Sequence, residues 1–166
     1  MKFFLPFILT WAAMAADTAQ SSYAAEFGKR WTATRKLAVG VADAMPANEY
    51  AFKPDPPSMD FGEQMVHIAV INYAFCAALK DEKSPATAKP KEKTDFVELM
   101  GDSFDYCSAQ ITSVSEAQMN TIHSTPDGKL NGRELLLALY VHLAHHRGQA
   151  EIYLRIKGIK PPPYVF

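Results

Sequence analysis

Residues 132–158 read GRELLLALYVHLAHHRGQAEIYLRIKG, and this segment determines both the fold and the candidate site. Its apolar residues recur at three- and four-residue steps, and Leu135, Leu139 and Tyr153 share one stripe that we expect to face a core. Gly158 stands where a residue with left-handed backbone commonly ends a helix. The segment therefore predicts a long amphipathic helix over residues 132–157.

Three earlier segments have the same helical periodicity. The first covers residues 18–45 and is closed by Pro46, and the third covers residues 94–114. The second continues to about residue 80 from a start near Ser58 or Asp60, either of which can cap its first turn. We find no internal repeat and no alternating strand pattern of useful length. The sequence predicts an all-α fold, a four-helix bundle with long connections.

The composition excludes several classes of protein. Of the 166 residues, 48% are hydrophobic and 21% charged, with a formal net charge of −1. The chain is therefore too apolar for a disordered protein and not basic enough for a general nucleic-acid binder. Its length favours a single domain with one core.

The first 15 residues have the pattern of a secretory signal peptide. Lys2 precedes an apolar run, and Ala13-Met14-Ala15 supplies small residues two apart. A membrane-spanning helix needs about 20 apolar residues, and this run is shorter. We expect residues 1–15 to be a secretory signal peptide and residues 16–166 the mature domain. The mature protein would be secreted or periplasmic, without a membrane span.

Whether the two cysteines form a disulfide depends on how the helices are arranged. Cys76 lies in the second helical segment and Cys107 in the third. In parallel helices the two residues would lie at similar heights, whereas in a simple antiparallel hairpin they would lie apart. A disulfide requires Cα atoms within about 7 Å of each other, so the bond depends on topology.

Three histidines form the candidate metal site. His142 and His146 are four residues apart on one helix, so both rings can reach the same point. His67, in the strongly apolar second helix, is the natural third ligand, and three imidazoles leave one coordination position open. The spacing alone also fits histidines that are hydrogen-bonded within a core. His123 lies in a predicted loop, and we interpret it as a solvated surface residue.

Two stretches resemble conserved signatures of the DinB family. One is His-x-x-His-His-Arg-Gly-Gln at residues 142–149 with the following Tyr-Leu-Arg-Ile-Lys-Gly, and the other runs from Met45-Pro46 to Gly-Glu-Gln-Met-Val-His at residues 62–67. The resemblance covers essentially the whole mature chain. It implies a bundle with up-down-down-up helix order, whose second and third helices are joined by a crossover over residues 81–93.

The resemblance also implies a ligand set. Carried over residue by residue, the metal ligands become His67, His142 and His146, with zinc or nickel as the expected divalent ion. His145 matches a position that is commonly histidine but not a ligand, so we expect it to lie beside the site or on the helix surface. Gln149 is expected to hold neighbouring groups rather than substrate.

The chemistry that would follow is hydrolysis or thiol transfer. A divalent ion on three neutral imidazoles can lower the pKa of a bound water or thiol, and the DinB resemblance implies enzymes that use small thiols. No residue is marked as the general acid or base. The candidates are Glu63, Asn72, Tyr73 and Tyr140, for each of which a structural role is the simpler interpretation.

Three hypotheses remain at this point. The protein is a metal-dependent hydrolase or thiol transferase acting on a small molecule, a periplasmic metal-binding or stress-related module without turnover, or a partner-binding bundle with core histidines. Export argues against a thiol co-substrate, because small thiols are chiefly cytoplasmic. The sequence allows a homodimer without predicting one.

Overall fold

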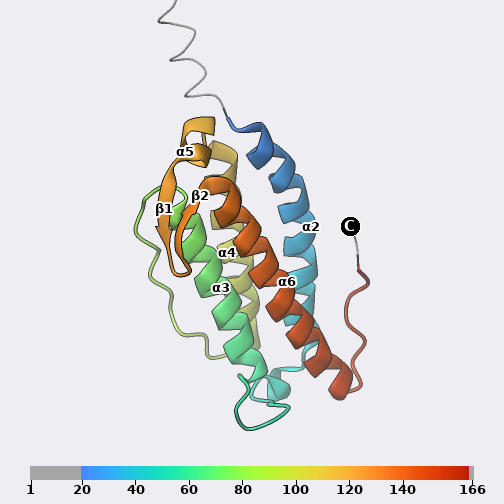
Figure 1. The fold of residues 1–166 in the computed structure, drawn as a ribbon. Coiled ribbons are helices and arrows are strands. Elements are labelled where there is room, and N and C mark those ends of the chain that lie inside the picture. Colours follow the sequence, from blue (N-terminus) through green and yellow to red (C-terminus); the bar gives the residue numbers. More distant parts are fainter. Residues whose placement is uncertain (1–19, 165–166) are drawn as a thin grey trace, which may run out of the picture.

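Four long helices form the body of the protein (Figure 1). The computed structural model describes residues 20–164, so the predicted signal peptide lies outside the described residues. The long helices are α2 (Ser22–Ala44), α3 (Phe61–Ala78), α4 (Lys93–Ser113) and α6 (Gly132–Ile156). Each lies within a few residues of a predicted segment, and the all-α bundle is confirmed.

Local sequence explains where these helices begin and end. Asp60 accepts a hydrogen bond from the backbone N–H of Glu63, whose side chain accepts one in return, so a capping box starts α3. Asn131 and Glu134 form the same motif at the start of α6. Gly158 has φ +73°, which confirms the predicted left-handed end of the last helix.

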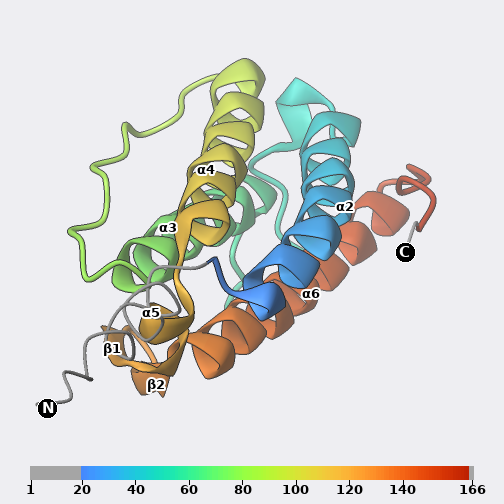
Figure 2. The same cartoon turned by 90° about the horizontal axis from the view of Figure 1, so that it is seen from above.

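The helices follow the up-down-down-up order. Helices α3 and α4 run in the same direction, opposite to α2 and α6, and residues 79–92 cross the length of the bundle between them (Figure 1). Seen from above, α4 and α6 lie diagonally opposite each other, with α2 and α3 between them (Figure 2). Helix α3 therefore packs against α4 on one side and α6 on the other.

The core is apolar, with aromatic residues at its centre. Trp31 of α2 is 1% exposed, lies 4.7 Å from the ring of Phe104 between centroids, and donates its indole N–H to the Phe104 carbonyl at 3.2 Å. This bond satisfies the one polar atom of the tryptophan in the core. Within residues 20–164, no helix has the length and apolar character that crossing a bilayer requires.

A disulfide joins Cys76 of α3 to Cys107 of α4. The two Cα atoms are 5.2 Å apart and both residues are fully buried. Because α3 and α4 are parallel and each cysteine lies about four turns from the start of its helix, the two side chains reach the same height. The topology thus decides the alternative that the sequence left open.

The connection between α4 and α6 differs from the prediction. It contains a short helix, α5 (Glu116–Asn120), and an antiparallel hairpin of β1 (Ile122–Thr125) and β2 (Gly128–Asn131), where no strand was expected. The interpretation of His123 as a solvated residue was also wrong, because it is 0% exposed. Its Nδ1 lies 3.1 Å from a carboxylate oxygen of Asp81, and its Nε2 lies 2.8 Å from the carbonyl oxygen of Gln118. These two acceptors make the burial of a polar ring tolerable.

Candidate metal centre

Three imidazole rings meet between α3 and α6. The Nε2 atom of His67 lies 3.0 Å from Nε2 of His142 and 3.1 Å from Nε2 of His146. His142 and His146 share one face of α6 because they are one helical turn apart, and the neighbouring α3 supplies His67. The predicted convergence of these three rings is confirmed.

The spacing of the nitrogens fits a transition-metal ion. Metal–nitrogen bonds of about 2.0–2.1 Å place two ligand nitrogens about 2.9 Å apart at a right angle and about 3.3 Å apart at a tetrahedral angle. The two separations from His67 fall between these values. Three nitrogens this close cannot all carry protons, because their N–H groups would point at one another. The arrangement therefore allows the three lone pairs to face a common point when an ion is bound.

Burial keeps the three rings in the form that binds metal. It lowers the pKa of His67 below the ordinary histidine value. The pKa of His142 is lowered by burial and by the neighbouring His67, and that of His146 is lowered by burial and by the other two rings to about 4. At neutral pH all three imidazoles are therefore uncharged, as metal ligation requires.

A pair of glutamines orients one of these rings. The Nδ1 of His146 donates to Oε1 of Gln64 at 2.9 Å, and the Gln64 amide donates to Oε1 of Gln149 at 2.9 Å. With its proton on Nδ1, His146 presents an unprotonated Nε2 to the other two rings. Such outer hydrogen bonds fix the orientation of a ligand and raise its basicity. Gln64 was not predicted as a supporting residue, because its place one turn before His67 was the one indication that the sequence offered.

The neighbouring residues of α6 take the supporting positions that were expected. His145 is exposed, and the Gln149 amide donates to its Nε2 at 2.9 Å, so it lies beside the ligand cluster rather than within it. Gln149 thus links α6 to Gln64 of α3, as predicted. Arg147 pairs with Glu151 on its own helix at 3.4 Å.

The four candidate acid–base residues are engaged elsewhere. Glu63 belongs to the capping box and forms an ion pair with a lysine of the preceding loop. Asn72 is fully buried and donates to a serine of α4. Tyr73 and Tyr140 pack against aromatic rings. Structural roles therefore account for all four.

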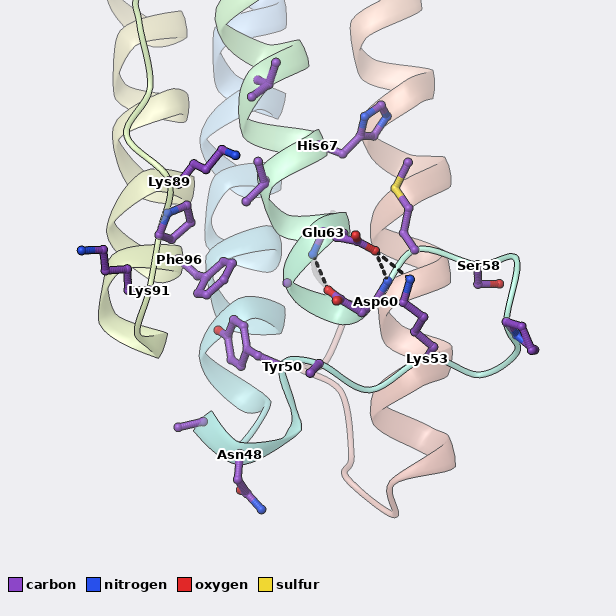
Figure 3. A pocket seen from close by; sticks show the side chains of 18 of the residues that line it. Asn48, Tyr50, Lys53, Ser58, Asp60, Glu63, His67, Lys89, Lys91 and Phe96 are labelled. Atoms are coloured by element: carbon purple, nitrogen blue, oxygen red, sulfur yellow. Dashed lines mark hydrogen bonds and ion pairs between the residues drawn. The ribbon is translucent and has the colours of Figure 1, made fainter.

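A groove reaches the candidate site from the side of α3 (Figure 3). It has a volume of about 950 Å³, and His67 lies at one end of it. Val66 and Val70 give it an apolar wall, and Lys89 of the crossover borders it. A smaller hollow of about 550 Å³ on the side of α6 is lined by His142. The site is thus approached from two sides, of which the α3 side is the larger.

Comparisons with known proteins identify the family and agree with the fold. A family model described as the DinB superfamily matches residues 30–150. The uncharacterized protein YjoA of Bacillus subtilis is 27% identical over 135 residues, which cover 78% of this chain and 88% of that protein. The crystal structure of YjoA, a DinB-like protein, is similar with a TM-score of 0.72 and 21% identity, covering 84% of this chain and 96% of that chain. A DinB-like protein from Bacillus cereus also gives a TM-score of 0.72, with 16% identity and coverages of 84% and 95%.

The matched segment contains most of the described residues, including all three clustered histidines. This chain belongs to the DinB superfamily.

Proposed function

We propose that the protein is a divalent-metal-dependent enzyme in which His67, His142 and His146 bind the ion. The observation that carries this proposal is the approach of three Nε2 atoms to a common point, with neutral rings. Zinc and nickel are the expected ions, because imidazole suits both. The family assignment supports the same ligand set.

The reaction we propose is hydrolysis or thiol transfer on a small molecule. When bound, a divalent ion on three neutral imidazoles supplies a positive charge that lowers the pKa of a water or thiol at its open position. Gln64 holds the proton of His146 on Nδ1, which keeps that ring oriented during turnover. A groove of about 950 Å³ has the size of a small-molecule site, and His67 lies at its end.

The groove indicates what the substrate looks like. Its wall is apolar at Val66 and Val70, and its border carries Lys89 of the crossover. Glu63 in the same groove is already neutralised by Lys53 at 3.2 Å. We therefore propose a substrate with an apolar body and an anionic group, its reacting end at His67. A small ester or a small thiol that carries a carboxylate meets this description.

One observation favours a second candidate function, a periplasmic metal-binding or stress-related module without turnover. Glu63, Asn72, Tyr73 and Tyr140 all have structural partners. Within the part of the chain that the structure describes, these candidates leave no assigned proton donor or acceptor for catalysis. A module of this kind would bind the ion and fill its remaining position with a protein ligand.

Export remains part of the proposal. The buried disulfide between Cys76 and Cys107 supports it, because such bonds persist mainly in oxidising compartments. A secretory signal in residues 1–15 would direct the protein to the periplasm or beyond the cell. Intact mass measurement on protein from the native cells tests this, since cleavage near Ala15 removes that segment. An intact N-terminus in the cytoplasmic fraction would contradict export.

Metal analysis of the full chain, purified without a histidine tag, tests metal binding. We expect about one zinc or nickel ion per chain after incubation and dialysis. His67→Ala should abolish this stoichiometric binding, whereas His145→Ala, which changes a neighbouring exposed histidine, should retain it. A metal content that stays at trace level, or equal loss in both variants, would contradict the proposed ligand set.

Cobalt-loaded protein distinguishes an enzyme from a filled site. Visible absorption of cobalt reports its coordination, so an open position should respond when a small carboxylated thiol is added. Lys89→Glu should weaken that response by repelling the anionic group, while Lys83→Glu, a change at an exposed lysine outside the groove, should leave it unchanged. A spectrum that never responds to water-soluble ligands would favour the non-catalytic module.

A further inference from the structure

The outer face of α6 carries an exposed apolar stripe. Leu137, Val141, Ile152 and Ile156 are 57%, 59%, 51% and 55% exposed. They make up half of the exposed large hydrophobic residues within residues 20–164. Single exposed apolar residues are ordinary on a protein surface, but a row along one helix indicates an interaction site.

The stripe points away from the core of the molecule. At about 100° per residue, Leu137, Val141 and Ile152 project within about 60° of one another, roughly opposite the buried Leu139 and Leu143. Figure 2 shows α6 at the edge of the bundle, diagonally opposite α4. No other described helix covers this face.

The spacing of the stripe suits a second copy of the same helix. Leu137 and Val141 are four residues apart near one end, and Ile152 and Ile156 are four apart near the other. A two-fold axis through the middle of α6 would place the first pair of one copy against the second pair of the other. Gly148, close to that middle, would meet no atom within 4 Å if it carried a Cβ, so a partner helix can approach closely there.

The charges at the ends of the stripe point to the same partner. Exposed Glu134 lies in the first turn of α6 with exposed Asp127 of the hairpin beside it, and Arg133 of the same turn is paired with Glu116. Exposed Arg155 and Lys160 lie at the C-terminal end of the helix. In an antiparallel pair each acidic end faces a basic end, whereas a parallel pair would bring like charges together. An anionic lipid surface would repel the acidic end. The charge pattern therefore favours an antiparallel copy of this chain.

We propose that the outer face of α6 forms the two-fold interface of a homodimer, with the two α6 helices antiparallel and closest near Gly148. Leu137 and Val141 also line the hollow beside His142, so the partner would close that approach to the three histidines. Access would then run along the groove at His67. This last consequence rests on the proposed metal-dependent function, whereas the dimer itself does not.

Sedimentation velocity on the full chain tests the interface. We expect a dimer at micromolar concentration, and Val141→Glu should convert it to a folded monomer by burying a charge in the contact. Ile122→Glu is the matched control, because Ile122 is 58% exposed but lies on the hairpin. It should remain dimeric. A monomeric unmodified protein, a Val141→Glu variant that stays dimeric, or binding of the monomer to phosphatidylglycerol vesicles would overturn the proposal.

Cysteine cross-linking tests the orientation. Leu137→Cys and Ile156→Cys lie near opposite ends of the stripe, and in the antiparallel dimer position 137 of one copy faces position 156 of the other. A mixture of the two variants should therefore cross-link several-fold more than either variant alone. Stronger cross-linking of each variant with itself would indicate a parallel pair and overturn the arrangement. The His67→Ala variant should dimerise normally, which separates this test from that of metal binding.

Discussion

The contact between α3 and α4 and the contact between α3 and α6 share one helix but differ in chemistry. Towards α4, helix α3 presents buried apolar residues and the disulfide of Cys76. Towards α6 it presents Gln64 and His67, which bind side chains of the last helix through polar atoms. The first contact is buried and cross-linked, and the second is polar and partly open to a groove.

This difference suggests that the contact between α3 and α4 mainly stabilises the fold, whereas the contact between α3 and α6 holds the candidate site. A site that must admit an ion and a substrate cannot be packed as tightly as a core, and half-buried imidazoles contribute little apolar burial. The disulfide-linked contact between α3 and α4 holds α3 in place, so that His67 can face α6 through polar contacts. We expect changes at one contact to leave the property of the other nearly intact.

Removing the disulfide should have the largest effect on stability. Cys76 and Cys107 are 31 residues apart in sequence, so the cross-link restricts the unfolded chain by about 3–4 kcal/mol in the chain-entropy model. The double variant Cys76→Ala/Cys107→Ala should lose that amount in urea unfolding while its folded form keeps its metal stoichiometry. A loss well below 1 kcal/mol, or loss of metal from the folded variant, would break the proposed separation.

Changing Gln64 should lower metal affinity while leaving the stability of the fold nearly unchanged. Gln64→Ala removes the acceptor that orients His146, and loss of such an outer hydrogen bond lowers metal affinity about 10- to 100-fold. Gln64→Glu keeps an acceptor for the Nδ1 proton and should recover most of the affinity. Competition with a chromogenic chelator measures both. Equal metal affinities for the unmodified protein and the alanine variant would show that Gln64 does not support metal binding.

Changing Asn72, which contacts α4, should cause a smaller loss of stability. Its amide donates to Ser103 at 3.1 Å in a fully buried position, so Asn72→Ala should cost about 1 kcal/mol of stability. Metal affinity and the cobalt response to thiols should not change. Should the variant unfold normally but lose that response, Asn72 would belong to the reaction rather than to the packing.

Near neutral pH the ionisation of the three site histidines should have the smallest effect on the stability of the metal-free protein, and the effect should grow on acidification. The three site histidines have a lowered pKa when folded, that of His146 about 4, so between about pH 6.5 and 4 the unfolded chain binds more protons. Stability must therefore fall as the pH drops through this range. Urea midpoints at several pH values measure this slope, and His146→Ala should reduce it. An unchanged slope in that variant would contradict the burial argument.

The helices were predictable because their signals are local. The capping box of Asp60 and Glu63 and the left-handed Gly158 can be recognised in the chain and occupy the expected places. The pair His142 and His146 was recognisable for the same reason, since helix geometry alone puts both rings on one face. His67 could be singled out as a polar residue in a strongly apolar helix, but its approach to the other two rings is visible only in the folded structure.

The hairpin was not predictable because its burial pattern reverses the usual one. Ile122 is 58% exposed whereas the adjacent His123 is 0% exposed, so apolar character does not mark the inner face of β1. His123 is tolerated there because the Gln118 carbonyl and Asp81, which is distant in sequence, provide acceptors. Gln64 was overlooked for a related reason, because its partners lie on α6 and become visible only when the helices are placed together.

Anomalous X-ray diffraction at the absorption edge of the bound metal tests the central claim most directly. Crystals of the protein loaded with zinc or nickel should show one strong peak per chain, at bonding distance of about 2.0–2.1 Å from the Nε2 atoms of His67, His142 and His146. A peak elsewhere on the molecule, or none at this cluster in fully loaded crystals, would contradict the account.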